Sequence, residues 1–497
     1  MKSKSTLSRR WSPILIGLGL FLGGCAVGPG FQSPSPPKTT AYVEGNLPLQ
    51  TEETTIPGGA AQTFVSGKDI PGEWWRLFHS RPLDALIKRA LHNSPTLAAA
   101  QAACQQAEEN LNVAVAAFLP SLTFQPQYQR SGYNYSALGL ESVIPARTFN
   151  LFGSMLNASY TLDVWGGIRR QIEAAKAQRD FQEFINEATY SGLVANVVMT
   201  AISEASLEEQ VKVIEKLLSV QETELSLIEE KFKAGVVSSL EVLAAKNKIF
   251  VTKSSLCSLR LVLAKIRHSL AVLIGDTPHE ATLPSFRLAD FHLPQDLPVS
   301  LPSELVKQRP DIRAAEEVLH AASAQVGVAT ANLLPQITIS GFDGFLSNSL
   351  SGYFQQGNVF WNLTTGLVQP IFKGGALLAQ QRQALALFDQ ACAEYKTTVL
   401  KAIQSVADNL RALQLDAENL GSRTQEEETT HNILDLTRSQ LALGAVDTLS
   451  VLQIEEAYLQ VSIKRIQAQA ERFVNTAALF YELGGGWWNR KKKEENK

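Results

Sequence analysis

The sequence predicts a mixed α and β fold built from two internal repeats, each with two amphipathic strands and a long helical hairpin. Three observations predict it. The segment KFKAGVVSSLEVL at 231–243 matches QLALGAVDTLSVL at 440–452, and other pairs of segments recur in the same order. Short segments alternate apolar and polar residues, as strands with one apolar face do. Long proline-free segments step apolar residues by three and four, as coiled-coil helices do.

The N-terminus predicts export and a lipid anchor. Residues 1–10 are basic and lack acids, 14–22 are wholly apolar, and small residues precede Cys25. This is the pattern of a signal peptide over 1–24, with an apolar segment too short to span a bilayer permanently. The LGGC ending also fits the lipobox of bacterial lipoproteins, in which the cysteine becomes acylated. We therefore favour lipid attachment at Cys25, followed by a linker over 25–72, over a free buried cysteine.

Composition argues against a nucleic-acid partner. The chain has 45 basic and 48 acidic residues, and the signal peptide holds four of the bases and no acid, so the mature chain is mildly acidic. Cys104, Cys257 and Cys392 stand singly in Ala-rich sequence and are interpreted as small core residues. They have neither metal-ligand spacing nor a disulfide framework, so we expect no metal site and no cofactor.

Turn signals and the alternation of apolar and polar residues predict the repeats and their strands. The first repeat is predicted over 73–275 and the second over 302–483, with a proline-rich linker at 276–301 and a tail at 484–497. In each repeat a proline ends an Ala-rich helix, because proline disfavours helix in the residue before it. Extended sequence follows, and four strands are expected at about 121–135, 148–163, 336–346 and 358–371.

Helical hairpins are expected at about 166–275 and 374–482, with turns at Gly235 and Gly444 that fit helix C-caps. The second helix of each hairpin carries a strict 3-4 apolar stripe, which predicts a packed seam. Its members are Leu240, Leu243, Asn247, Phe250, Ser254, Cys257, Leu261 and Ala264, and then Leu449, Leu452, Glu456, Leu459, Ile463, Ile466, Ala470 and Phe473. Asn247 and Glu456 are interpreted as a register-setting polar layer rather than a ligand site.

Four strands with an apolar face cannot close on themselves. A bilayer does not permit open sheet edges, and membrane barrels begin at about eight strands. Together with the export signal, this indicates an oligomeric outer-membrane pore whose helices extend into the periplasm. The alternative from physics alone is a lipid-anchored periplasmic coiled-coil scaffold without a pore.

Several motifs resemble the TolC-like outer-membrane efflux proteins, in particular their NodT-type lipoprotein branch. They are CAVGPGFQSP at 25–34, WWRLFHSRPLDALIKRAL at 74–91, PIFKGG at 370–375 and ELGGGW at 482–487. The resemblance implies a homotrimer, with a twelve-stranded transmembrane β-barrel continuous with a long α-helical coiled-coil barrel. It implies a lipid-anchored protein of the outer membrane that extends into the periplasm.

The resemblance also implies a function, namely the passive exit duct of a tripartite RND-type pump that expels drugs or other small molecules. The implied partners are a periplasmic adaptor protein, an inner-membrane RND transporter and outer-membrane lipid. Channels for type I protein secretion or metal-cation efflux share the resemblance and stay open as alternatives. We expect no enzyme, since the chain has no HExxH, no GxSxG and no phosphate-binding GxxxxGK[ST].

The resemblance places a gate at the hairpin tips, where relatives carry a ring of acidic side chains. Glu241 falls at one such position after Gly235, whereas Ser450 and Gln453 stand after Gly444 where relatives often have aspartate. A neutral ring would bind cations weakly. The turn residues Gly235, Val236, Gly444 and Ala445 are candidates for adaptor docking. Leu441 and Val446 further suggest that apolar packing, more than salt links, holds the tip.

Overall fold

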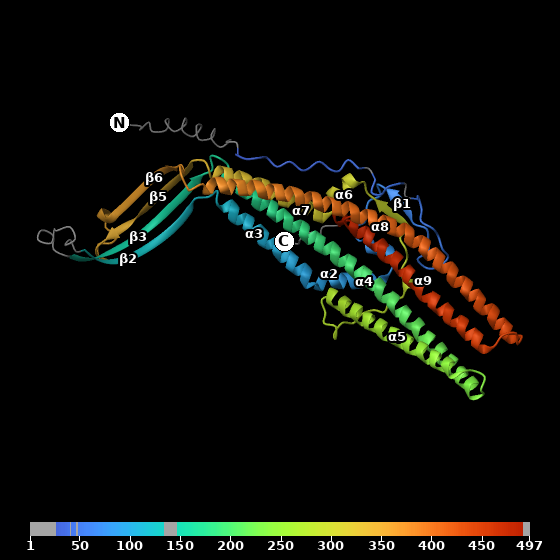
Figure 1. Cartoon of the computed structure of the whole chain (residues 1–497). Helices are drawn as coiled ribbons and strands as arrows, with labels where there is room; N and C mark the ends of the chain where they lie inside the picture. The colour runs from blue at the N-terminus through green and yellow to red at the C-terminus, as the bar shows by residue number, and fades with distance from the viewer. Residues whose placement is uncertain (1–25, 40, 46–47, 134–146, 491–497) are drawn as a thin grey trace, which may run out of the picture. The chain divides into compact units, whose positions relative to one another are not determined.

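The computed structural model describes residues 26–39, 41–45, 48–133 and 147–490. They divide into two compact units, which are treated one at a time. The first unit holds 104–181 and 315–395 together with the N-terminal residues up to Ser33, and the second holds 34–103, 182–314 and the rest of the chain from 396. Figure 1 gives the order of the elements along the chain.

The first unit is built on one four-stranded antiparallel sheet. Its strands are β2 (Ser121–Tyr133), β3 (Arg147–Leu162), β5 (Gln336–Ser347) and β6 (Val359–Val368). They pair in the order β2-β3-β5-β6, so each repeat contributes one hairpin, and β3 joins β5 across the repeats. Strands β2 and β6 therefore end the sheet, and each has one side without a partner strand among the described residues.

Side-chain alternation explains the strands. In β2, Leu122, Phe124 and Tyr128 lie on one face, and each is more than half exposed. Strand β6 ends at Val368 rather than at about 371, because Pro370 has no N–H to donate to a ladder. Beyond it, Ile371 and Phe372 are almost fully exposed. The sheet therefore presents apolar side chains without cover from its own chain.

The helices of the two repeats match in length. Helix α3 (Pro95–Ala116) corresponds to α7 (Pro310–Ala331), and both have 22 residues. The hairpin helices α4 (Gly167–Lys233) and α8 (Ala376–Ala442) have 67 residues each, and α5 (Ser239–Leu273) and α9 (Thr448–Glu482) have 35 each. Among the described residues, no helix combines the length and the apolar character that crossing a membrane would require.

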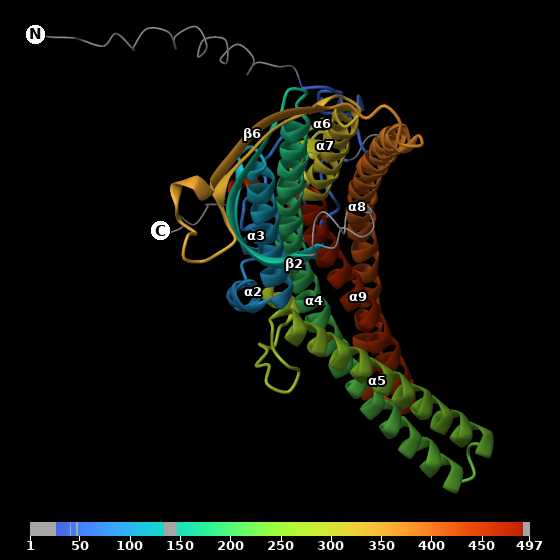
Figure 2. The same cartoon turned by 90° about the vertical axis from the view of Figure 1, so that its left-hand side faces the viewer.

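In the second unit the hairpin helices form one layer in the order α5–α4–α9–α8 (Figures 1 and 2). Val211 of α4 packs with Leu256 and Leu263 of α5, and Leu217 and Val220 of α4 pack with Leu459 of α9. Helices α8 and α9 are joined by Arg465 to Glu427 at 2.9 Å. Helices α5 and α8 therefore form the edges of the layer.

The predicted stripes behave differently in the two repeats. In α9, Leu459, Ile466 and Phe473 of the stripe are buried, as predicted. In α5 the prediction is wrong for the single chain, because Leu240, Leu243, Phe250, Cys257 and Leu261 are exposed. The packed face of α5 consists instead of Ala245, Ile249, Thr252, Leu256, Leu263, Leu270 and Ala271. The reason is position in the layer, since α9 has a neighbour on each side and α5 has one.

An aromatic core holds the rest of the second unit together. The smaller elements are η2 (Trp74–Phe78), α2 (Arg81–Asn93), α6 (Pro302–Gln308), η6 (Trp487–Asn489) and the parallel pair β1 (Thr63–Ser66) and β4 (Asp296–Val299). Trp74 stacks on Phe480 with ring centroids 5.4 Å apart, and Phe473 contacts Phe78 and Phe291. All five side chains are essentially buried. The core therefore joins the start of the first repeat, the linker and the end of α9.

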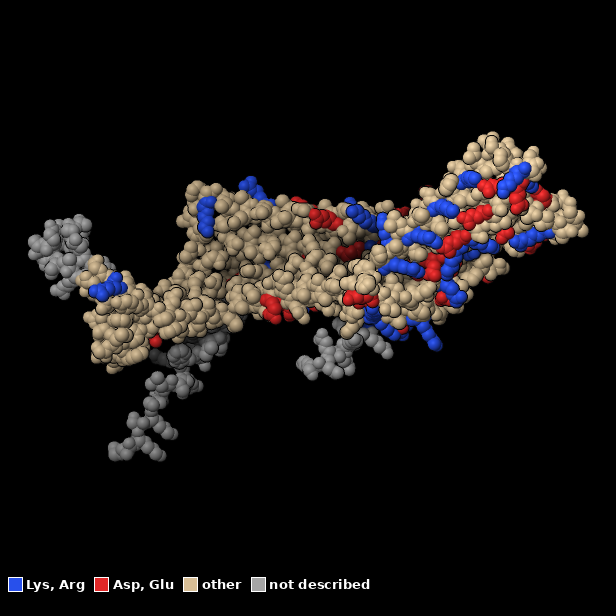
Figure 3. Space-filling view, turned by 90° about the horizontal axis from the view of Figure 1, so that it is seen from below, with Lys and Arg blue, Asp and Glu red and all other residues tan. Residues whose placement is uncertain are grey.

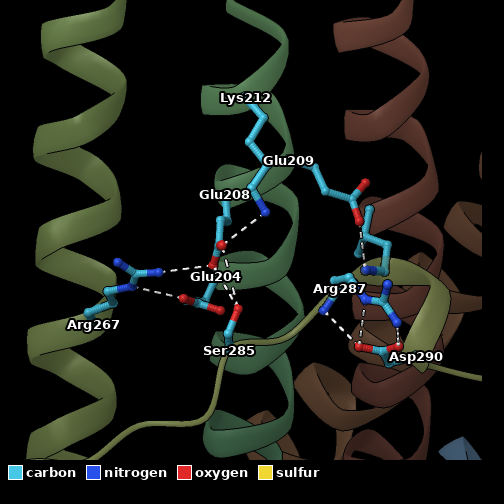
Figure 4. Close-up of polar contacts among 9 residues, drawn as sticks. Glu204, Glu208, Glu209, Lys212, Arg267, Ser285, Arg287 and Asp290 are labelled. Atoms are coloured by element: carbon cyan, nitrogen blue, oxygen red, sulfur yellow. Dashed lines mark hydrogen bonds and ion pairs between the residues drawn. The ribbon is translucent and has the colours of Figure 1, made fainter. Parts of the chain in front are cut away.

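Hydrogen bonds fasten the linker between the repeats to hairpin α4–α5, beside ion pairs that join the two helices of the hairpin (Figure 4). Arg267 of α5 pairs with Glu204 at 2.8 Å and with Glu208 at 2.9 Å, and Ser285 of the linker donates to Glu208. The Leu288 amide, in η4 (Leu288–Asp290), donates to Glu209 at 2.9 Å. Burial raises the pKa of the Glu204 carboxyl above its usual value, although Arg267 acts against this.

Candidate gate at the hairpin tips

The two hairpin turns have the same geometry. At the first, the Gly235 amide donates to the Phe232 carbonyl and the Val236 amide to the Lys231 carbonyl, both at 2.9 Å. At the second, Gly444 and Ala445 make the corresponding bonds to Leu441 and Gln440. This is a Schellman ending, which needs a left-handed residue, and both glycines have positive φ, 76° and 72°. Val236 is 71% exposed, so this turn presents an apolar side chain.

Ser450 belongs to the N-terminal cap of α9. Its amide donates to Asp447 Oδ1 at 3.0 Å and its hydroxyl donates to the same oxygen at 2.7 Å. The other carboxylate oxygen of Asp447 accepts from Lys231 Nζ at 2.6 Å. Lys231 and Ser450 together hold the pKa of Asp447 well below its usual value. Lys231 lies in the last turn of α4, so this ion pair links the tips of the two hairpins.

Glu241 caps the other short helix. Its carboxylate accepts from the Ser238 amide at 3.3 Å and from the Ser238 hydroxyl at 3.4 Å, as in a capping box. Glu241 and Gln453 are both exposed, on α5 and α9 respectively. The three gate candidates therefore lie on two different hairpins, and Glu241 and Ser450 each contact their own N-cap residue.

Sequence reasoning missed Asp447, which brings a carboxylate to the turn where only neutral side chains were assigned. The signal was present, since an aspartate directly before an apolar periodic segment is a typical N-cap. The Asp447–Lys231 pair also adds a polar link that the prediction of apolar packing at the tip did not include. Acidic and basic side chains are interspersed over the hairpins, and few lie over the strands (Figure 3).

Cys25 lies outside the described residues, but the segment directly after it is firmly packed in the first unit. The Val27 amide donates to the Trp165 carbonyl at 3.0 Å, and Arg170 Nε donates to the Val27 carbonyl at 3.2 Å. Gly28 has a φ of 92°, and a Cβ there would lie 2.5 Å from the Gly327 Cα. Phe31 stacks on His320 at 4.3 Å. The chain that leaves the predicted anchor therefore has a fixed path along α4 and α7.

Comparison with known proteins decides the family. The model of the family described as outer membrane efflux protein matches residues 86–276 and 301–485. The chain belongs to the outer membrane efflux protein family. The two matched segments cover both hairpins and all four strands of the sheet.

Individual relatives match over most of their length. The chain is 30% identical to the pyoverdine export outer membrane protein OpmQ of Pseudomonas putida, over 86% of this chain and 91% of the relative. It is 26% identical to nodulation protein T of Rhizobium leguminosarum bv. trifolii, over 93% of each. The solved outer-membrane channel OprN superposes with a TM-score of 0.80 at 26% identity, covering 93% of this chain and all of that one.

These findings confirm several of the sequence predictions. The resemblance to efflux channels of the NodT type, the mixed α and β fold and the outer-membrane location are confirmed. The protein is an outer-membrane efflux channel of a family of channels rather than enzymes. The alternative of a periplasmic scaffold without a pore finds no support among these relatives.

Proposed function

We propose that three copies of this chain form a passive exit duct for an RND-type efflux pump, closed at rest by the hairpin tips. One observation carries the proposal. Among the described residues, both the four-stranded sheet and the layer of hairpin helices have two edges without a neighbour. The duct needs no catalytic site, because the energy for export comes from the inner-membrane transporter.

The sheet edges favour a barrel made from several copies. In the part of the chain that the structure describes, β2 and β6 each have one unpaired side, and β6 carries the exposed side chains Trp361, Leu363 and Leu367. Unpaired backbone groups are costly in a bilayer, so β2 of one copy should pair with β6 of the next. Three copies of four strands give the twelve-stranded barrel that the family resemblance implies.

The helical edges favour the same closure. Helix α5 exposes Leu240, Leu243 and Phe250, and the opposite edge helix α8 exposes Ile433 and Leu436, with Leu443 exposed directly after its end. Both sets lie in the parts of these helices nearest the tips. Packing α5 of one copy against α8 of the next would bury both sets, at about 25 cal/mol per Å² of apolar surface removed from water.

The partners follow from the location. A channel that extends into the periplasm needs an adaptor to reach an inner-membrane transporter, and the exposed turns at Gly235, Val236, Gly444 and Ala445 are the proposed docking points. Acyl chains on Cys25 would hold the start of each copy in the outer membrane, next to the packed segment that begins at Ala26.

Accumulation of a fluorescent efflux substrate tests the function. In cells that lack their own outer-membrane efflux channels, this chain, expressed with a periplasmic adaptor and an RND-type transporter, should lower accumulation. The control is the same cell without the transporter. Unchanged accumulation, with the protein shown to be in the outer membrane, would contradict the proposal.

A further inference from the structure

A buried cluster of charged and polar groups joins the two hairpins within the chain. Lys248 of α5 forms ion pairs with Glu456 of α9 and, at 3.2 Å, with Glu224 of α4. Gln221 of α4 donates to Glu456 at 2.9 Å. Gln221, Glu224 and Glu456 are each at most 5% exposed. Charges that are buried this deeply are tolerated only when they are paired.

Two further ion pairs lie on the same α4·α9 seam. Lys216 of α4 approaches Glu455 of α9 at 3.5 Å, and Lys231 of α4 pairs with Asp447 at the start of α9 at 2.6 Å. The seam therefore has cations on α4 and α5 and three acids on α9, and its buried centre is the cluster around Lys248.

The repeat offers a direct comparison, because every position of the first hairpin has an equivalent in the second. The α4 positions Lys216, Gln221, Glu224 and Lys231 correspond to Gln425, Thr430, Ile433 and Gln440 of α8. The α9 positions Asp447, Glu455 and Glu456 correspond to Ser238, Lys246 and Asn247 of α5, and Lys248 corresponds to Ala457. The equivalent positions of the two edge helices thus hold no acid and a single cation, Lys246.

We propose that this difference is a pairing code that makes each first-repeat hairpin join a second-repeat hairpin. The proposal rests on the proposed ring of three chains, which brings together six hairpins of the same length and nearly the same shape. In that ring two kinds of seam alternate, the α4·α9 seam within a chain, which is joined by ion pairs, and an α8·α5 seam between chains, whose equivalent positions hold no pair of opposite charges.

Incorrect pairings are disfavoured by the charges they leave without partners. If α8 met the α9 of another copy, Glu456 would face Thr430 and Ile433, and the equivalent of Lys248 would be Ala457. A buried carboxylate would then have no cation, which is strongly destabilising. If α4 met another α5, Lys231 would face Ser238 in place of Asp447, and Lys216 would face Lys246, so attraction would give way to repulsion.

The pairing code predicts what happens when the residues of the α4·α9 seam are replaced by those at the equivalent positions of the other repeat. The variant Gln221→Thr, Glu224→Ile, Lys248→Ala and Glu456→Asn gives the buried part of the α4·α9 seam the residues of the edge helices. Its hairpins should remain helical but should lose pairing specificity. The fraction of trimer, measured by native mass spectrometry in detergent, should fall about tenfold, because a wrong pairing of hairpins would no longer leave a buried charge without a partner. A trimer fraction equal to that of the wild type would overturn the proposal.

If the four-residue variant does not fold, exchanging the charges of Glu456 and Lys248 provides a second test. The single change Glu456→Lys places two ammonium groups in the cluster, whereas Glu456→Lys with Lys248→Glu returns one cation between two carboxylates. The double variant should unfold at a higher temperature than the single variant and should recover the trimer. If the two variants behave alike, the cluster carries no pairing information. Glu222→Gln is the matched control, since its ion pair with Lys253 is half-exposed and lies within the first hairpin.

The same measurements separate this proposal from the trimer on which it rests. A wild-type chain that is not a trimer would remove the proposed function. The ranking of the single and double variants in thermal unfolding would still test the cluster, because Lys248 and Glu456 meet within one chain.

Discussion

At the scale of single residues, the tip chemistry depends on Asp447 more than on the residues assigned from the sequence. Its carboxylate caps α9 through Ser450 and pairs with Lys231 of the other hairpin. Ser450, placed at a gate position by resemblance, is therefore engaged in a local hydrogen bond. An N-cap is readable from the sequence, but its cross-hairpin partner is not, because Lys231 is distant along the chain.

Replacing Asp447 with Ala should loosen the first turn of α9. Loss of an N-cap side chain costs about 1 kcal/mol, which corresponds to several-fold faster amide exchange at 448–451. Hydrogen exchange followed by mass spectrometry measures this rate. Asp435→Ala, near the C-terminal end of α8, is the control and should leave 448–451 unchanged. Equal exchange in the wild type and Asp447→Ala would contradict the assignment of the cap.

The direction in which the pKa of Asp447 is shifted gives the pH dependence of its ion pair with Lys231. The pKa of Asp447 is lower in the folded chain than in the unfolded chain, so its contribution to stability is complete above the unfolded value of about 3.9. It is lost only as the pH falls through the lower folded value. Exchange at 448–451 should therefore differ between the wild type and Asp447→Asn to the same extent at pH 7 and pH 5. A difference that disappears by pH 5 would contradict this order of pKa values.

Cys25 remains a prediction from the lipobox. Changing Cys25 to Ser should prevent acylation, so the variant should not incorporate radioactive palmitate, whereas Cys257→Ser should label like the wild type. Persistent labelling of Cys25→Ser would show that the acylated residue lies elsewhere.

At the scale of elements, periodicity predicted strands and helices well, and neighbours decided which faces are buried. Proline and glycine signals placed the ends of the helices, since Pro120, Pro335, Gly235 and Gly444 act through local backbone geometry. The apolar stripe of α5 was correct as a pattern but not as the packed face within one chain. A sequence shows which residues share a face, but it does not show which helix covers that face.

The gate prediction belongs to this scale, because it concerns the ring formed by equivalent turns. Gln453→Asp should make the channel more cation-selective and more easily blocked by Mg²⁺ from the periplasmic side, since a ring of carboxylates binds divalent ions strongly. Single-channel conductance measures the block, and Glu241→Gln tests the rival acidic position. The neutral-ring prediction fails if the wild type is already blocked at low Mg²⁺ concentration and Glu241→Gln does not relieve the block.

At the scale of the whole molecule, the account depends on closure by further copies. In the described part of one chain, the four-stranded sheet has two unpaired edges and the layer of hairpin helices has two more. The strand number was predictable from alternation, and the need for partners followed from the cost of open edges in a bilayer. The number of copies is not contained in these edges, because two chains or three could satisfy them, and it comes from the family resemblance.

The mass of the detergent-extracted protein tests this central claim most directly. Native mass spectrometry should give three times the mass of the mature chain, and the same preparation should conduct ions across planar lipid bilayers. A stable, conducting single chain would contradict the account, because a barrel of four strands cannot enclose a pore.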